Sequence, residues 1–137
     1  MISIKDLMIG NWVRNDLGEI QQVVEIRDNE KIMLAYNDFY SVDELEPIPL
    51  TAEILEKNGW VYEFDKMEYM VKYDLAEKGK NCWMMWNIKE HNLDIQRQDE
   101  KLDMYNLKVQ RVCIPCDYVH QLQNALRLCG IEHEIIL

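Results

Sequence analysis

The C-terminal end of the chain contains the pattern that most limits what it can fold into. Apolar residues recur there at spacings of three, four and three, which places them on one side of a helix. They are Val119, Leu122, Leu126 and Cys129. Gly130 suits the left-handed residue that ends many helices, and an apolar segment follows it to Leu137. We therefore predict a helix, a glycine stop and a closing apolar strand, with the apolar side of the helix covering a sheet built by the preceding chain.

The other side of this helix is polar. Its candidate interaction residues are His120, Gln123, Asn124 and Arg127. Such a stripe suits a carboxylate, a phosphate or a protein partner, although a solvated helix face is the simpler interpretation. No nucleophile or paired carboxylate lies at a defined spacing from His120. The pattern therefore indicates no catalytic residues, and we expect a protein that is not an enzyme.

Residues 1–48 have the pattern of a small β module. Short segments rich in β-branched and aromatic residues alternate with turns that contain Asp, Asn and Gly. The predicted strands are 11–14, 19–26, 31–36 and 39–42. Their spacing favours a curled SH3-like β-barrel, an architecture that serves too many purposes to indicate an activity.

Pro47 and Pro49 mark a boundary, because they hold the chain extended and exclude a helix interior or central strand. Residues 49–137 then have the pattern of an α+β module, with a short helix at 52–58 that Thr51 caps. Its predicted strands are 60–64, 67–73, 82–88, 93–96 and 107–114, with a loop at 97–103. The expected fold is α+β: an N-terminal barrel-like module, then an antiparallel meander covered by the C-terminal helix.

Cys113 and Cys116 form a CxxC at the end of a predicted strand. In thioredoxin-like proteins a helix N-terminus beside such a motif stabilises a thiolate, but only 21 residues follow Cys116 and no βαβ unit precedes it. The motif could also supply half of a zinc site. The other half would have to come from scattered residues: Cys82, Cys129, His120 or His133. We interpret the pair as structural, with no metal or cofactor, and keep zinc binding or thiol redox chemistry as an alternative.

The predicted strand at 82–88 is apolar on both faces. Trp83 and Met85 point to one side, and Cys82, Met84 and Trp86 to the other. Either this strand is central in its sheet, or Trp83 and Met85 belong to an interface, where such residues are enriched. They are our candidates for self-association or partner binding.

Charge limits the classes of partner. The net charge is −10 and the pI about 4.7, which opposes binding to nucleic acids or anionic membranes through Lys and Arg. No segment has the length of a membrane span or the pattern of a signal peptide. We therefore expect a cytoplasmic protein with four reduced cysteines.

Three segments carry a resemblance to a known family. They are Leu7-Met-Ile-Gly-Asn-Trp-Val, Ile48-Pro-Leu-Thr-Ala-Glu-Ile-Leu-Glu-Lys-Asn-Gly-Trp and Tyr118-Val-His-Gln-Leu-Gln-Asn. Together they resemble a family of small uncharacterised proteins of gut Bacteroidetes, often encoded in prophage-like or mobile regions. The resemblance implies a phage or mobile-element accessory protein and no catalytic residues. We expect it to act through a protein partner or by self-association. The alternative is a nucleic-acid-associated module that uses the N-terminal barrel.

Overall fold

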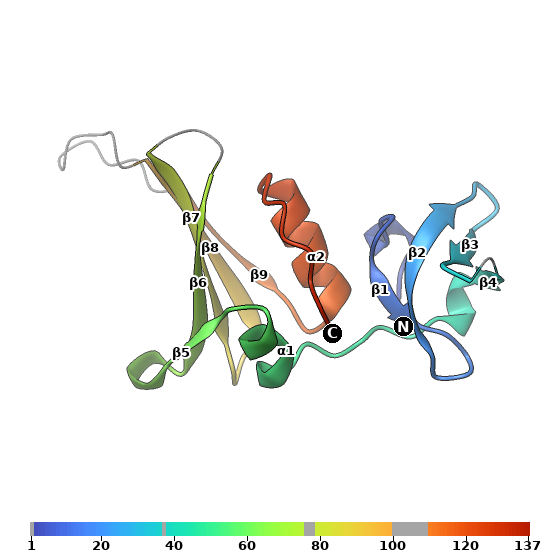
Figure 1. Cartoon of the computed structure of the whole chain (residues 1–137), viewed down its shortest axis with the longest axis horizontal. Coiled ribbons are helices and arrows are strands. Elements are labelled where there is room, and N and C mark those ends of the chain that lie inside the picture. Colours follow the sequence, from blue (N-terminus) through green and yellow to red (C-terminus); the bar gives the residue numbers. More distant parts are fainter. Residues whose placement is uncertain (1, 37, 76–78, 100–109) are drawn as a thin grey trace. The chain divides into compact units, whose positions relative to one another are not determined.

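The computed structural model describes residues 2–36, 38–75, 79–99 and 110–137. The fold is α+β, with antiparallel sheets and short helices, as predicted (Figure 1). The chain forms two compact units: Met1–Pro49 with Tyr118–Ala125, and Leu50–Asp117 with Leu126–Leu137. The division after Pro49 lies one residue beyond the predicted boundary. Residues 118–125, which we assigned to the second module, lie in the first unit.

Four strands form the antiparallel sheet of the first unit, in the order β1-β2-β3-β4. They are β1 (Trp12–Arg14), β2 (Ile20–Ile26), β3 (Lys31–Leu34) and β4 (Phe39–Ser41). An irregularity between Val23 and Glu25 shifts the pairing of β2 with β3, and such a bulge bends a strand and increases its twist. The short helical turns η1 (Ile4–Asp6) and η2 (Val42–Glu44) flank the sheet. The prediction of a small curled sheet from these strands is confirmed.

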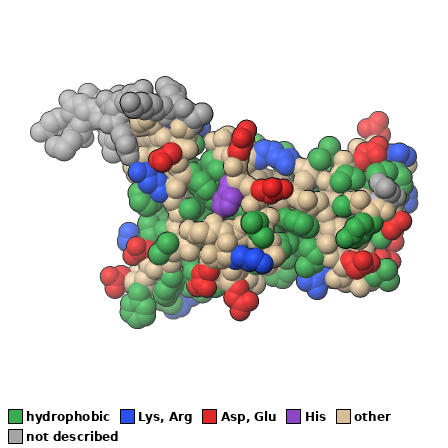
Figure 2. All heavy atoms as spheres, viewed as in Figure 1, with side chains coloured by type: hydrophobic (Ala, Val, Ile, Leu, Met, Phe, Trp, Pro, Cys, Tyr) green, Lys and Arg blue, Asp and Glu red, His purple; other side chains and the backbone are tan. Residues whose placement is uncertain are grey.

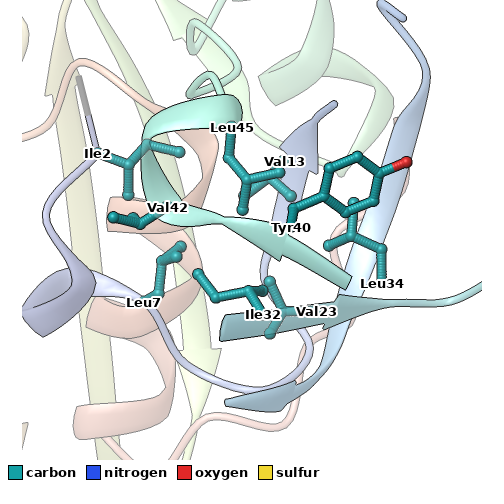
Figure 3. Close-up of a cluster of buried hydrophobic side chains, with 9 residues drawn as sticks. All are labelled: Ile2, Leu7, Val13, Val23, Ile32, Leu34, Tyr40, Val42 and Leu45. Atoms are coloured by element: carbon teal, nitrogen blue, oxygen red, sulfur yellow. The ribbon is translucent and has the colours of Figure 1, made fainter. Parts of the chain in front are cut away.

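The core of the first unit contains apolar residues from every strand and both flanks. In Figure 3 these side chains gather around a common centre. They are Ile2, Leu7, Val13, Val23, Ile32, Leu34, Tyr40, Val42 and Leu45. Side chains that alternate along a strand point to opposite faces, and the core residues share the inner face. In β3, Ile32 and Leu34 are fully buried, while Lys31 at the start of the strand is exposed.

We predict that Leu34→Ala lowers the free energy of unfolding of the first unit by about 2–5 kcal/mol, because it leaves a cavity at a fully buried position. Leu17→Ala is the matched control, since Leu17 lies in the same unit and is 77% exposed. It should change the free energy by no more than about 0.5 kcal/mol. Urea denaturation measures both, and equal losses would contradict this assignment of the core.

The second unit contains a five-stranded antiparallel sheet in the order β5-β6-β7-β8-β9. The strands are β5 (Val61–Glu63), β6 (Glu68–Asp74), β7 (Lys80–Asn87), β8 (Asn92–Asp99) and β9 (Gln110–Pro115). The short turn η3 (Phe64–Lys66) follows β5. Strand order follows chain order, so the predicted meander is confirmed, and β7 is its central strand.

One loop prediction is partly wrong. We expected residues 97–103 to form a loop because they are polar, but β8 continues through Asp99. Arg97 pairs with Cys82 of β7 on one side and Gln110 of β9 on the other. Backbone pairing on both sides therefore outweighs the polarity of the side chains. Residues 100–103, and the predicted start of the last strand at 107–109, lie outside the described residues.

The structure confirms both predicted helices. In α1 (Ala52–Lys57), the Thr51 side chain accepts a hydrogen bond from the Ile54 N–H at 3.3 Å. In α2 (Val119–Leu128), the chain turns at Gly130, whose φ is +72°. The N–H of Gly130 bonds the Arg127 carbonyl, and the N–H of Ile131 bonds the Leu126 carbonyl. These two bonds form a Schellman C-cap, which satisfies carbonyls that the helix leaves unpaired.

Two expectations for the C-terminal region are wrong. Residues 131–137 do not form a strand, because the Asn58 side-chain amide bonds both the N–H and the carbonyl of Ile136 in place of a partner strand. The apolar residues of α2 also do not all belong to the unit whose sheet we expected them to cover. Val119 and Leu122 lie in the first unit, while Leu126 and Cys129 lie in the second.

Candidate functional site

The polar side of α2 is anchored within the first unit. The Gln123 Oε1 accepts a hydrogen bond from the Trp12 N–H at 2.8 Å, and its Nε2 donates to the Gly10 carbonyl at 3.1 Å. One side-chain amide thus pairs with both a donor and an acceptor of the backbone at the start of β1. This pairing gives Gln123 a structural role.

Asn124 makes a second anchor of the same kind. Its Nδ2 donates to the Asp6 carbonyl at 2.6 Å, and its Oδ1 accepts from the Asn11 Nδ2 at 2.9 Å. Asn11 is fully buried, and its own Oδ1 accepts from the Met8 N–H at 2.8 Å. A buried amide is costly unless its donors and acceptors are paired, so Asn124 helps to satisfy Asn11.

His120 is not on a solvated face, and the interpretation of the four polar residues as a solvent-facing stripe is wrong for it. Its side chain is 3% exposed, and its ring stacks on Tyr118 with the centroids 5.9 Å apart. Its Nδ1 is buried and makes no hydrogen bond within the described part of the chain. Burial lowers the pKa of His120, although the nearby Asp6 opposes this shift. Of the four residues, Arg127 is the one that is exposed.

We predict that Gln123→Ala lowers the free energy of unfolding by about 1–3 kcal/mol, because it leaves the Trp12 N–H without its acceptor. Gln110→Ala is the matched control, since Gln110 is exposed on β9. It should cost no more than about 0.5 kcal/mol. If denaturation shows no difference between the two variants, the anchoring role of Gln123 is wrong.

His120 also predicts a pH dependence. Its pKa is lowered in the folded state, so the unfolded state binds more protons below the unfolded value of about 6.5. The contribution of neutral His120 to the free energy of unfolding is therefore fully present above about pH 6.5. As the pH falls below this value, that free energy decreases by up to about 1.4 kcal/mol per pH unit. His120→Gln should reduce the loss of stability between about pH 7.5 and about pH 5.5. If His120→Gln loses as much stability over this pH range as the unchanged protein, the assignment is wrong.

The CxxC residues have opposite environments. Cys113 is exposed on β9, in register with Asp94, whereas Cys116 is fully buried. The Cys116 carbonyl accepts a hydrogen bond from the Trp86 Nε1 at 2.8 Å, and its N–H donates to the His91 carbonyl at 2.8 Å. Burial raises the pKa of the Cys116 thiol to about 12, so it is protonated at neutral pH. Because the thiolate is the reactive form, this environment does not activate Cys116.

Metal-ligating residues do not cluster in the described ranges. Across residues 2–36, 38–75, 79–99 and 110–137, His, Cys, Asp and Glu form no group of three that could hold a metal ion. His120 lies in the first unit, and the CxxC lies in the second.

The central strand β7 is mostly covered on both faces. Cys82, Met84 and Trp86 are buried on one face, and Met85 is 9% exposed on the other. Trp83 is half-buried, with the Lys72 ammonium 5.9 Å from its ring centroid. Burial on both faces is expected for a central strand. It leaves Trp83 and Met85 little free area for an interface.

An exposed apolar surface lies instead at the β5 edge of the second sheet. We define the β5 edge as Val61, Tyr62, Phe64 and Met67, which are 65%, 39%, 81% and 39% exposed. The Tyr62 and Phe64 rings meet edge to face with centroids 6.4 Å apart, and Tyr62 contacts the Tyr69 ring at 5.2 Å. Alternation in the sequence identifies this segment as a strand, but it does not show that the strand lies at an edge.

Tyr69 holds the inner end of this aromatic row. Its hydroxyl donates to the Glu56 Oε1 at 2.6 Å, and this hydrogen bond raises the pKa of Tyr69 to about 12. Glu56 belongs to α1, so the row is tied to a helix of the same unit. The edge is therefore held in place before any partner binds.

Charge is dispersed over the surface. Figure 2 shows Asp and Glu side chains scattered across the visible face, with Lys and Arg side chains between them. In the described ranges neither α1, with 6 residues, nor α2, with 10, has the length and apolar content of a membrane span.

Comparison with known proteins gives no relative for this chain. No protein-family model, curated protein or solved structure matches it.

Proposed function

We propose that this protein is a non-enzymatic accessory protein that self-associates through the β5 edge. The observation that carries this proposal is the exposure of four apolar residues within the seven positions 61–67, next to an unpaired strand edge. Exposed apolar area that is not scattered but contiguous is typical of interaction sites. Aromatic residues and Met are also enriched in protein interfaces.

A second copy is the occupant that fits the edge. An edge strand presents unpaired N–H and C=O groups to another strand, and β5 pairs only with β6 in the described sheet. Antiparallel pairing of β5 with itself, centred on Tyr62, sets Val61 opposite Glu63 of the second copy, so the two Glu63 carboxylates do not face each other. A two-fold contact of this kind closes on itself and produces a dimer.

The charge of the chain sets the conditions for this dimer. Glu63 and Asp65 are exposed beside the apolar residues, and the chain carries a net charge of −10. Two copies therefore repel at low ionic strength, and salt screens the repulsion, with a Debye length of about 8 Å at 0.15 M. Dimerisation should accordingly strengthen as salt increases.

We predict a dimer in light scattering at high micromolar protein concentration, with a larger dimer fraction at higher salt. Phe64→Ser should weaken the dimer at least about tenfold, because it removes the most exposed aromatic ring of the edge. Leu128→Ser is the matched control: Leu128 is 82% exposed at the end of α2, outside the edge.

A monomer at every salt concentration would refute self-association. Equal weakening by Phe64→Ser and Leu128→Ser would refute the β5 edge as its surface. If Trp83→Ser is the only variant that loses the dimer, the interface is formed by Trp83 and Met85 instead of the β5 edge.

The proposal also covers the architecture of the first unit. We assign it an SH3-like barrel architecture, supported by the order β1-β2-β3-β4, the irregularity in β2 and the single buried core. The role in phages or mobile elements, and the cytoplasmic location, rest on the resemblance and sequence patterns given above. Salt-sensitive retention on a nucleic-acid column would favour the alternative of a nucleic-acid-associated module instead.

A further inference from the structure

Strand β9 forms the edge of the second sheet that lies opposite β5. Among the described residues it pairs with β8 alone, and it has 6 residues where β5 has 3. Gln110, Arg111, Val112 and Cys113 are exposed along it. Val112 is 51% exposed, although Ile95, the residue in register with it on β8, is buried. The strand therefore has an open side in the part of the chain that the structure describes.

The hydrogen bonds to β8 show which backbone groups of β9 face this open side. In an antiparallel pair, opposite residues alternate between those that exchange backbone hydrogen bonds and those that exchange none. The Cys116 N–H donates to the His91 carbonyl at 2.8 Å, which continues the register of the β8–β9 ladder by one position. The residues of β9 that bond to β8 are therefore every second one before Cys116: Ile114, Val112 and Gln110.

The residues between them direct their backbone groups away from β8. They are Arg111, Cys113 and Pro115. Pro115 supports this assignment, because proline has no N–H and stands where β8 requires none. The open side thus presents the N–H and C=O groups of Arg111 and Cys113 and the C=O of Pro115. Such a row of backbone groups is a template for another strand.

Charge allows a second copy of the chain to approach this edge. The chain carries a net charge of −10, so most of its surface repels another copy. β9 has no acidic side chain, and Arg111 is its one charged residue. The Arg111 Nε donates to both Asp94 carboxylate oxygens of β8 at 3.1 Å, which offsets its charge locally. Two β9 strands therefore meet with little repulsion.

Two β9 strands also fit each other when they run antiparallel about a two-fold axis at Cys113. The Cys113 residues of the two copies then exchange both free backbone bonds, and the Arg111 N–H donates to the carbonyl of Pro115 in the other copy. The missing N–H of Pro115 leaves this pairing intact. Val112 lies opposite Ile114 of the other copy, twice, at the pair positions where side chains approach more closely.

The register centred on Val112 is less favourable. It sets the two Arg111 side chains two positions apart, or about 7 Å along the strands. The register centred on Cys113 sets them four positions apart, or about 14 Å, which exceeds the Debye length of about 8 Å at 0.15 M salt. The register centred on Val112 also places Gln110 opposite Ile114, so it covers less apolar area.

We infer that β9 is a second self-association edge, which pairs with β9 of another copy in the register centred on Cys113. It is independent of the β5 edge and lies on the opposite side of the same sheet. The side chains that it covers, Val112 and Ile114, include no aromatic ring, so this contact is weaker than the β5 edge. When both edges are paired, the contacts alternate along a chain of copies that does not close.

The test uses Cys113 as a reporter in the full chain. Opposite residues that exchange backbone bonds have Cα atoms about 5.5 Å apart, so a short bismaleimide spans the two thiols. The chain carries Phe64→Ser, which weakens the β5 edge, and Cys129→Ser, which leaves Cys113 as the accessible cysteine because Cys82 and Cys116 are buried. We expect a covalent dimer that mass spectrometry maps to Cys113 in both copies, and no larger species.

Gln110→Cys in a chain with Cys113→Ser is the matched control. Residue 110 is exposed on the same strand, but in this register it lies about 20 Å along the strands from residue 110 of the other copy. Its cross-linking should be at least about tenfold slower than that of Cys113, because pairing does not concentrate these two thiols. Equal rates at positions 110 and 113 would indicate random collision and overturn the inference.

A second pair of variants tests the side chains of the contact. Val112→Lys should slow cross-linking at Cys113 by at least about tenfold, because it replaces the apolar contact with Ile114 by a charge near Arg111. Val24→Lys should leave the rate unchanged, since Val24 is 42% exposed on β2 of the first unit. Equal rates in these two variants would overturn the inference. The comparison of positions 110 and 113 decides the question even if Val112→Lys fails to fold.

Chains that retain Phe64 separate this inference from the β5 proposal. If both edges pair, light scattering of the cross-linked protein shows tetramers and longer species with Phe64, but dimers with Phe64→Ser. Cross-linked dimers in both chains would refute the β5 edge and support β9. The absence of a Cys113 cross-link from both chains would refute β9, whatever the β5 edge does.

Discussion

The first unit depends on two side-chain amides that come from the far end of the chain. Gln123 and Asn124 of α2 bond backbone groups of Asp6, Gly10 and Trp12, which belong to the start of the first sheet and its preceding turn. Unpaired backbone groups are costly when they are buried, and these amides pair a donor and an acceptor each. The Asn11–Asn124 contact joins residues 113 positions apart. The first unit therefore cannot be complete until α2 has formed.

That requirement changes where function can lie. The polar side of α2 is largely taken up by the unit's own backbone, and His120 is buried as a neutral ring rather than presented to a ligand. One surface without such a role is the β5 edge, where aromatic side chains remain exposed although Tyr69 and Glu56 hold the row in place. An exposed apolar surface held by internal contacts has little conformational entropy to lose on binding, which favours association.

The environments of the cysteines also do not follow from their spacing in the sequence. Cys113 and Cys116 are close in sequence, but they differ completely in exposure, and burial keeps the Cys116 thiol protonated. Thiol chemistry depends on contact and on local charge, and spacing along the chain indicates neither unless a motif fixes the fold around it.

Local patterns alone determined much of this protein: the α+β class, most strands of both sheets, the Thr51 cap and the Gly130 stop. Each depends on interactions within a few residues, such as side-chain alternation, capping and backbone conformation, which the sequence displays directly. Only the tertiary structure decided that residues 118–125 complete the first unit, that His120 is buried and that β5 is an edge. These features arise because segments that are distant in sequence pack together. An amphipathic pattern predicts that one face of an element is buried, but it does not predict which segment buries it.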